Sequence, residues 1–537
     1  MADLEPAVQA ASDRVQDRPA FSSPPLGHAL SILDSLIRRQ ENLVLSVSLI
    51  VITAFSLLFA WRRPFWMDEY LVLQTALAGG SPTALWNLMK GAPLSVDPPL
   101  FHFLVLYFLR IFGPTEFGTR LPSVLAYTLM SLLLYRFVRK YADVYTGLAV
   151  LALCLACGTF QYAYEARPYA LVLAADTLAL LCWSNIVDTQ HSRKLALSGL
   201  FLGVAIAVGS HWFGGLVLVP LVFGEVVRNW QTRKIDVGVW AALVVGGTTV
   251  VAYLPLLKAA SEYRSLPWRG AHLWDIFSTF QLVMQPCLVP LTVLMVILAL
   301  ARFMFGTPPP ELERPSIPSP VFICVVLLAL TPFPGFLVGR LVSHTFLPRY
   351  VLLCTIGLLF LVSLTIRKAV GRSAVWMGLS VLIIGGCATL LQYRQLSSLP
   401  FGGDASILAD VSVFSAEPSL PIVPSDIELL LRLEAHGPAS LRTRCVYATD
   451  PSSVRILHHN TELLYTRALR RWTRLPIRDL SSFLSVYPRF YVIGPIRGHG
   501  TRDWVVRRML EEHADIALQG AFAGEPVYLV TVNHAQP

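Results

Sequence analysis

The chain has 537 residues, of which 54% are hydrophobic and only 14% are charged, and its mean hydropathy is +0.57. A soluble domain carries charge on about a quarter of its residues, so the composition excludes an ordinary soluble protein and indicates a polytopic membrane protein. The net charge of +9 comes from Lys and Arg in short loops between apolar runs, a pattern that sets membrane topology and does not indicate nucleic-acid binding.

The first 42 residues are polar and contain several prolines, which predicts a flexible cytoplasmic segment. They are too long and too acidic to be the charged region of a cleaved signal. The apolar run that follows, residues 43–61, is therefore expected to remain as an anchor. A helix that crosses the hydrocarbon core needs about 20 mostly apolar residues.

Ten further apolar runs are expected to cross the membrane. They cover residues 120–138, 144–162, 168–187, 194–210, 213–228, 236–256, 286–305, 318–338, 349–366 and 374–392. With the first run they predict an α-helical membrane domain of about 11 transmembrane helices over residues 43–392.

One more apolar run, residues 98–112, is short and opens with two prolines. If it does not cross, every basic short loop falls on one side of the membrane, as the positive-inside rule requires. If it crosses, the later basic loops face outward. We therefore expect an interfacial or partly buried helix inside a large outer loop, residues 62–119.

Polar and aromatic groups gather in the outer loops of this topology. The loops contain "FWMDEY" and "DPPL", then "YEARPY", then "SHWFGG", then a loop over residues 257–285, and last "LPRYV". The candidate site residues are Trp66, Asp68, Glu69, Tyr70, Asp97, Glu165, Arg167, His211, Arg349 and Tyr350.

Asp68 and Glu69 are the candidate catalytic residues. They lie at the membrane edge between aromatic residues, and a carboxylate beside an apolar wall can accept a proton from an alcohol or an amine. Trp66, Tyr70 and, from the last loop, Tyr350 are candidate sugar contacts. The alternative is that the two carboxylates are solvated loop charges or acids at a helix N-terminus.

Arg167 and Arg349 each begin a predicted span on the outer side. Two guanidinium groups at similar depth suit a phosphate, because each binds its oxygens bidentately. Snorkelling toward lipid headgroups is the alternative for either residue. Glu165 could equally be an ion-pair partner of Arg167.

A divalent metal ion is a further alternative for this face. His211, Asp97 and Glu165 are the supporting residues, since a histidine beside carboxylates can join a metal shell. The spacing is not diagnostic, and a single His is more often a hydrogen-bonded interface residue. The eight cysteines show neither metal-ligand spacing nor a disulfide framework.

The chain turns polar in residues 393–537, which are expected to form a small soluble α/β domain on the outer side. "RCVYATD", "RFYVIGP" and "PVYLVTV" predict short buried strands. "TRDWVVRRMLEEHAD" predicts an amphipathic helix with Thr501 as its N-cap.

Six motifs in order carry a resemblance to a known family: "FWMDEY", "DPPLFHFLVLYFLRIFG", "EFGTRLPSVL", "YEARPYALVL", "SHWFGG" and "LPRYVL". They resemble the bacterial protein O-mannosyltransferase-like branch of the C-type glycosyltransferases, whose relatives include the aminoarabinose transferases of lipid A. The resemblance covers roughly residues 43–366. Asp97 stands where many relatives carry a His or Glu metal ligand.

The resemblance implies a polyprenyl-phosphate-linked sugar donor, an outward-facing site and no nucleotide cofactor. It implies Asp68 as the essential acid and Arg349 as the residue that holds the lipid phosphate. We therefore expect an enzyme of the cytoplasmic membrane that transfers a hexose or pentose to a lipid, glycan or protein acceptor on the outer side, by an inverting single displacement.

Two other classes of function remain as alternatives. A secondary transporter or flippase for a lipid-linked or anionic substrate would favour midplane charges and two related halves, and the sequence has no visible repeat. A non-enzymatic cell-envelope assembly protein would not need Asp68 and Arg349 to meet across distant loops.

Overall fold

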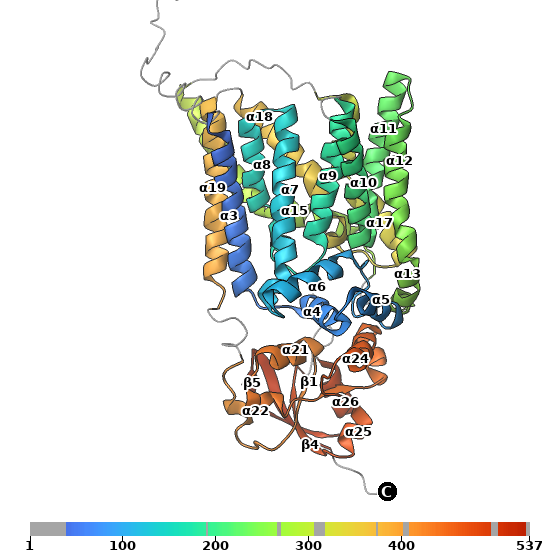
Figure 1. The fold of residues 1–537 in the computed structure, drawn as a ribbon. Coiled ribbons are helices and arrows are strands. Elements are labelled where there is room, and N and C mark those ends of the chain that lie inside the picture. Colours follow the sequence, from blue (N-terminus) through green and yellow to red (C-terminus); the bar gives the residue numbers. More distant parts are fainter. Residues whose placement is uncertain are drawn as a thin grey trace, which may run out of the picture.

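The structure is a computed structural model that describes residues 39–188, 192–265, 270–305, 317–371, 374–400, 408–495 and 503–532. A bundle of long helices forms the larger body, and a domain of helices and strands lies against one end of it (Figure 1). The expected helical membrane fold with a small C-terminal α/β domain is confirmed. Residues 1–38, most of the expected flexible segment, lie outside the described residues.

Within the described residues, eight helical segments are long and apolar enough to cross a membrane. They are α3 (Glu41–Arg62), α7 (Glu116–Tyr141), α9 (Tyr169–Val187), α10 (Arg193–Ser210), α11 (Leu218–Thr232) with the 3-10 turn η2 (Trp212–Val217) before it, α12 (Val237–Thr248) continuing into α13 (Leu254–Ala260), α15 (Trp274–Phe305) and α19 (Ala374–Ser397).

Three other expected spans differ from a straight transmembrane helix. The helix α16 (Ser319–Ala329) meets α17 (Pro332–Val338) at a bend of 54°, and the pair counts as a ninth span if it is read as one. The helix α8 (Val144–Ala156) has 13 residues, all of them buried by its neighbours. The helix α18 (Cys354–Val370) has 17 residues. A helix that is apolar on every side is typical of the interior of a bundle, and α8 fits that place.

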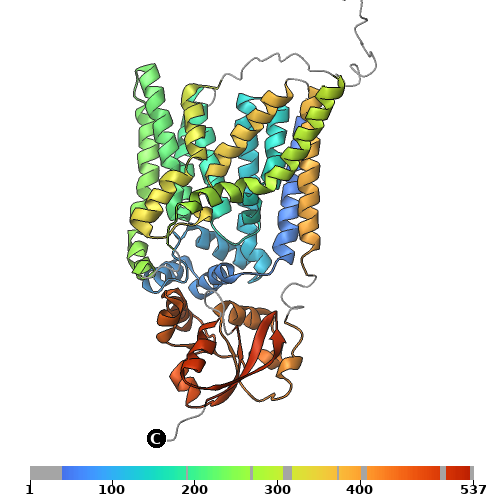
Figure 2. The ribbon, with the colours of Figure 1, turned by 180° about the vertical axis from the view of Figure 1, so that it is seen from behind.

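The outer loop expected over residues 257–285 needs correction, because most of that range is helical. It is occupied by the end of α13, by α14 (Glu262–Ser265) and by the start of α15. The expected span began at residue 286, but α15 begins at Trp274 and contains Pro286 and Pro290. Figure 2 shows α15 running obliquely across the other helices.

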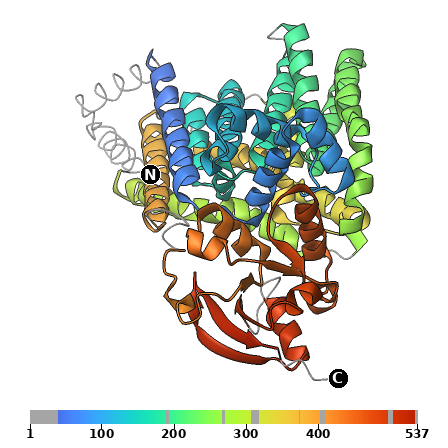
Figure 3. The ribbon, with the colours of Figure 1, turned by 60° about the horizontal axis from the view of Figure 1, so that its bottom comes forward.

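Three short helices cross the end of the bundle that faces the C-terminal domain, as Figure 3 shows from below. They are α4 (Met67–Gly79), α5 (Pro82–Gly91) and α6 (Leu100–Phe112). The helix α6 buries Phe101, Val105 and Leu109 on one side, while Ile111 and Phe112 are exposed. This amphipathic burial agrees with the interfacial helix expected from residues 98–112.

The C-terminal domain contains six strands: β1 (Ile422–Pro424), β2 (Tyr447–Thr449), β3 (Ile477–Asp479), β4 (Arg489–Ile493), β5 (Asp515–Phe522) and β6 (Glu525–Thr531). Their order is β1-β4-β6-β5, and β2 pairs with β3. An isolated parallel bridge between Ile422 and Cys445 joins the pair to β1. Four of the strands are therefore parallel in the order β3-β2-β1-β4, as in doubly wound α/β domains.

Helices cover this sheet and connect it to the bundle. They are α21 (Ile427–His436), α22 (Ala439–Arg442), α23 (Ser452–Leu457), α24 (Thr461–Trp472), α25 (Leu480–Leu484) and α26 (Trp504–Glu511). Asp503 precedes α26, and Thr501, the expected N-cap, lies outside the described residues. The indole of Trp472 on α24 donates to the carbonyl of Ala92 (3.0 Å), which anchors the domain beside α5.

Candidate active site

The two adjacent carboxylates open the helix α4. Trp66 is the N-cap, and its backbone N–H donates weakly to Glu69 (3.5 Å), as in a capping box. Successive side chains on a helix point about 100° apart. Asp68 and Glu69 therefore face different surroundings, although they are neighbours in the sequence.

Asp68 meets both arginines that the sequence singled out. Its Oδ2 lies 3.2 Å from Nη2 of Arg349 and 3.7 Å from Nη2 of Arg167. The three side chains are only 16%, 23% and 10% exposed, respectively. Arg349 and Arg167 lie 281 and 99 positions after Asp68 in the sequence. The fold therefore brings the expected base and the expected phosphate ligands to one place.

The fold holds each arginine in a short irregular segment at a helix start. Arg349 lies in the 3-10 turn η5 (Pro348–Val351), and its guanidinium sits over the ring of Trp66 at 5.1 Å. Arg167 follows the 3-10 turn η1 (Gly158–Ala163), just before α9. Burial opposes the charge of Arg167, but Asp68 and Asp97 outweigh it and raise the pKa of the guanidinium.

Asp97 and His211 form the second half of the site. Asp97 Oδ2 lies 3.3 Å from Arg167 Nη2, and its Oδ1 lies 3.6 Å from His211 Nε2. Burial alone would raise the pKa of Asp97, but the charge of Arg167 outweighs it and lowers the pKa. Burial lowers the pKa of His211 to about 4, so its ring is neutral at pH 7.

The contacts of His211 do not fit a metal ligand. Its Nδ1 accepts from the N–H of Phe213 (3.2 Å), so the neutral ring carries its proton on Nε2, facing Asp97. The cation of Arg167 already lies against Asp97. Among the described residues, no three His, Cys, Asp or Glu side chains lie close enough together to hold a metal ion.

Aromatic rings surround His211. The centroids of Tyr169 and Tyr350 lie 5.4 and 5.3 Å from its ring, and Phe213 lies 5.1 Å from Tyr350. Trp66 and Tyr350 therefore lie beside Arg349 and His211, and their contact with a sugar stays a prediction. Tyr70 lies apart from them: it packs against Phe65 and donates to Glu116 (3.2 Å).

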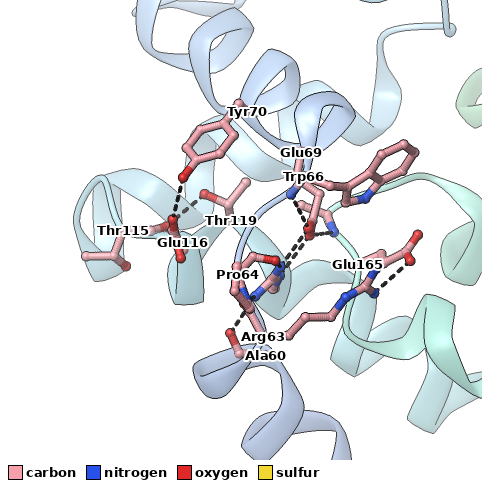
Figure 4. A network of polar contacts seen from close by, with 12 residues as sticks. Ala60, Arg63, Pro64, Trp66, Glu69, Tyr70, Thr115, Glu116, Thr119 and Glu165 are labelled. Atoms are coloured by element: carbon pink, nitrogen blue, oxygen red, sulfur yellow. Dashed lines mark hydrogen bonds and ion pairs between the residues drawn. The ribbon is translucent and has the colours of Figure 1, made fainter. Parts of the chain in front are cut away.

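Glu69 lies in an enclosed ion pair and does not face the arginines of the site. Its two oxygens accept from Arg120 at 2.7 and 2.6 Å, and both side chains are fully buried. The N–H of Ala166 also donates to Glu69 (2.7 Å). Arg120 donates further to the carbonyls of Ala60, Arg63 and Pro64, at the junction of α3 and α4 (Figure 4).

Glu165 pairs with Arg63. It does not pair with Arg167, the alternative partner expected from the sequence. The Arg63–Glu165 distance is 2.8 Å (Figure 4). Burial raises the pKa of Glu165, and the charge of Arg63 opposes the rise. The pair fixes the segment that leads from η1 to Arg167.

Sequence reasoning missed two functional candidates, Arg120 and His102. An arginine inside an apolar run needs a buried partner, and that signal in "EFGTRLPSVL" could have indicated Arg120. His102 on α6 is fully buried, and neither ring nitrogen has a partner among the described residues. Burial lowers the pKa of His102 to about 4, and the charge of Asp97 opposes the fall. His102 is therefore a neutral group in the field of Asp97, with no hydrogen-bond partner in the described part of the chain.

Comparisons with known proteins bear on the family and the fold of the chain. A family model described as dolichyl-phosphate-mannose-protein mannosyltransferase matches residues 96–255, which contain Asp97, Arg167 and His211. A search of curated proteins found no match.

Two solved structures of ArnT from Cupriavidus metallidurans match nearly the whole chain. The structure bound to undecaprenyl phosphate has a TM-score of 0.52 at 13% identity, and the apo structure has 0.54 at 12%. Each match covers 92% of this chain and 98% of the other. The chain has the C-type glycosyltransferase fold. The resemblance inferred from the six ordered motifs is confirmed.

Proposed function

We propose that the chain is a membrane glycosyltransferase that moves a sugar from a polyprenyl-phosphate donor to an acceptor on the outer face of the cytoplasmic membrane. The observation that carries the proposal is the meeting of Asp68 with Arg167 and Arg349 at the end of the helical bundle. The crystal structure of ArnT with undecaprenyl phosphate supports a lipid phosphate as the ligand of this fold.

The guanidinium groups would bind the donor phosphate. Arg349 and Arg167 are held close together and partly buried, where charge-assisted hydrogen bonds to phosphate oxygens are strong. Negative charge grows on the leaving oxygen as the bond to the sugar breaks, and fixed cations at that place stabilise the transition state. The apolar faces of the spans accommodate the polyprenyl tail.

Asp68 would act as the general base through Oδ1. Its Oδ2 accepts from Arg349 and makes the ion-pair contacts to both arginines, and Oδ1 makes no hydrogen bond within the described part of the chain. In the proposed step the acceptor oxygen or nitrogen forms a bond to C1 of the sugar. The C1–O bond to the phosphate breaks, its electron pair leaves with the polyprenyl phosphate, and the acceptor proton passes to Asp68. A single displacement inverts C1.

The remaining site residues would position these groups. Asp97 and His211 hold Arg167 and the aromatic wall, while Trp66 and Tyr350 are placed to contact the sugar. Glu69, paired with Arg120, orients the first turn of α4. Because the contacts of Asp97 and His211 do not fit a metal ion, no step is assigned to one.

Turnover of a labelled donor tests the proposal. Purified full-length protein in lipid vesicles is incubated with a radiolabelled polyprenyl-phosphate sugar and a crude envelope extract as the acceptor source. We expect protein-dependent release of polyprenyl phosphate and transfer of the label to a new product. A donor that stays intact while the protein binds and moves it across the vesicle would instead favour the transporter alternative.

A further inference from the structure

A cavity of about 890 Å³ lies between the bundle and the C-terminal domain. The end of α3, the helix α4, the first turn of α7 and the end of α21 enclose it, and its apolar walls come from Leu57, Leu58, Trp61, Leu73, Phe117 and Ala435. Neither Asp68 nor its two arginines line this cavity, so it is a separate site.

The apolar side of the cavity continues onto the lipid-facing surface of α3. Leu58 is 41% exposed and Trp61 is 70% exposed, at the end of a 22-residue helix that is apolar enough to span the bilayer. Trp is enriched where a membrane helix leaves the hydrocarbon core. An acyl chain can therefore pass from the bilayer into the cavity without crossing water.

The other side of the cavity is polar. The Tyr70 hydroxyl donates to Glu116 Oε1 (3.2 Å), and His436 Nε2 lies 2.6 Å from the same oxygen. The side chains of Glu116 and His436 are 25% and 30% exposed, so they remain accessible. Figure 4 shows Tyr70 directed toward Glu116 and away from Glu165.

The first turn of α7 adds hydrogen-bond donors at the same place. Thr115 caps the helix by accepting from the N–H of Gly118 (3.0 Å). The N–H groups of Glu116 and Phe117 precede the first intrahelical bond and have no carbonyl of their own helix to bind. The N-terminus of this 26-residue helix therefore presents partial positive charge beside the carboxylate of Glu116.

We propose that this cavity binds a zwitterionic membrane phospholipid with a primary-amine head. The ammonium group pairs with the Glu116 carboxylate, the phosphate meets the N-terminus of α7, and an acyl chain lies between Leu58 and Phe117. No Lys or Arg occurs among the described residues that line the cavity. His436 can carry a positive charge, but it already lies 2.6 Å from Glu116, so an anionic lipid would bring a negative charge to Glu116 with no further side-chain cation among these residues to balance it. Binding of this lipid does not depend on glycosyl transfer.

Photo-crosslinking without any sugar donor tests the site. Full-length protein is placed in vesicles that contain a lipid with a diazirine in one acyl chain and with an ethanolamine, choline or glycerol head. Labelled peptides are then mapped by mass spectrometry. We expect the ethanolamine lipid to label the peptide containing Leu57–Trp61 about fivefold more than the glycerol lipid, the preference that one exposed ion pair supplies. The choline lipid, which cannot donate hydrogen bonds from its head, should lie between them.

A charge-removing variant and a matched control complete the test. Glu116→Gln should reduce the ethanolamine preference to nearly one, while Glu41→Gln, which removes a carboxylate from the opposite end of α3, should leave it unchanged. Equal labelling by the three lipids in the wild-type protein would overturn the proposal, and this comparison needs no variant to fold. Retention of the preference by a folded Glu116→Gln protein would overturn it too.

Discussion

In the proposed mechanism Asp68 has two tasks, one for each carboxylate oxygen. Oδ2 faces Arg349 and Arg167 and keeps the guanidinium groups in place before a ligand arrives. A donor phosphate would then share those groups, because its oxygens accept the same hydrogen bonds. This exchange would leave the carboxylate beside the reacting centre, free to receive a proton.

The role of Arg349 predicts a graded loss of donor affinity. Arg349→Lys keeps the charge but loses the bidentate fork, and Arg349→Ala loses both. We expect affinity for a polyprenyl phosphate to fall modestly in the first variant and by tenfold or more in the second, an order of magnitude based on the energy of charged hydrogen bonds. Binding is measured by tryptophan fluorescence titration. Equal affinity in all three proteins would remove Arg349 from the site.

At the residue scale, the sequence indicated which groups gather but not how they pair. Asp68, Arg167 and Arg349 were predicted together because each lies in an outer loop with the same chemistry. Asp68 and Glu69 have different partners because α4 turns their side chains in different directions. The partner of Glu69 is Arg120, which lies more than 50 residues away in the sequence. Neighbouring identical charges in a sequence carry no signal for such a difference.

At the scale of elements, the Glu69–Arg120 pair ties α7 to the junction of α3 and α4. Loss of one partner of a buried ion pair costs about 3–5 kcal/mol. Glu69→Gln should therefore lower the thermal stability of the purified protein clearly. Glu165→Gln is the matched control, and its effect should be smaller because Arg63 is 30% exposed. A Glu69→Gln protein as stable as the wild type would contradict the structural role.

The C-terminal domain predicts a pH effect through Glu462 on α24. Burial raises the pKa of this carboxyl to about 8, the charge of Asp426 adds to the rise, and the hydrogen bond from Tyr447 opposes it. An unfolded glutamate has a pKa of about 4.3. Between these values the folded state binds more protons than the unfolded state, so stability falls as the pH rises from about 4 to about 8.

Hydrogen exchange of the amides in β2 measures this effect in the full-length protein. Protection of Tyr447 and Ala448 should fall between pH 5 and pH 8 after correction for the intrinsic exchange rate. Glu462→Gln should flatten the dependence, whereas Glu512→Gln at the C-cap of α26 should not. A flat profile in the wild-type protein would show that Glu462 is not protonated in the folded domain.

The elements that were hard to predict are those without a strong periodic signal. The strands β2, β4 and β6 follow apolar runs that the sequence indicated. The strands β1 and β3 have three residues each, and most of β5 is exposed, so none of them carries a clear alternating pattern. The start of α15 at Trp274 was also not predicted, since the helix extends 12 residues before the expected span and continues through Pro286 and Pro290, which a membrane helix tolerates.

At the scale of the whole molecule, the basic loops and the candidate active site lie at opposite ends of the bundle. The basic loops at Arg136–Lys140 and Arg228–Lys234 lie at one end in Figure 1, and α4, α5, α6 and the C-terminal domain lie at the other. The positive-inside rule predicts that the basic end is cytoplasmic. Hydrophobic runs and loop charges therefore predicted that the candidate site residues gather at the end opposite the basic loops, although they did not predict how these residues pair.

Cysteine labelling in intact cells tests this orientation. In a cysteine-free background, a cysteine at Thr449 should react with a membrane-impermeant maleimide, and a cysteine at Lys234 should react only after the cells are opened. The reverse pattern would place the site on the cytoplasmic side.

Single-turnover transfer by Asp68→Asn tests whether Asp68 takes the proton of the acceptor. The amide keeps the shape of the carboxyl group but cannot take the proton. With the donor already bound, we expect a transfer rate about 10²–10⁴ lower than in the wild-type protein, with the fold intact and donor affinity at least retained, since a competing negative charge is removed. A transfer rate close to that of the wild-type protein would contradict the account.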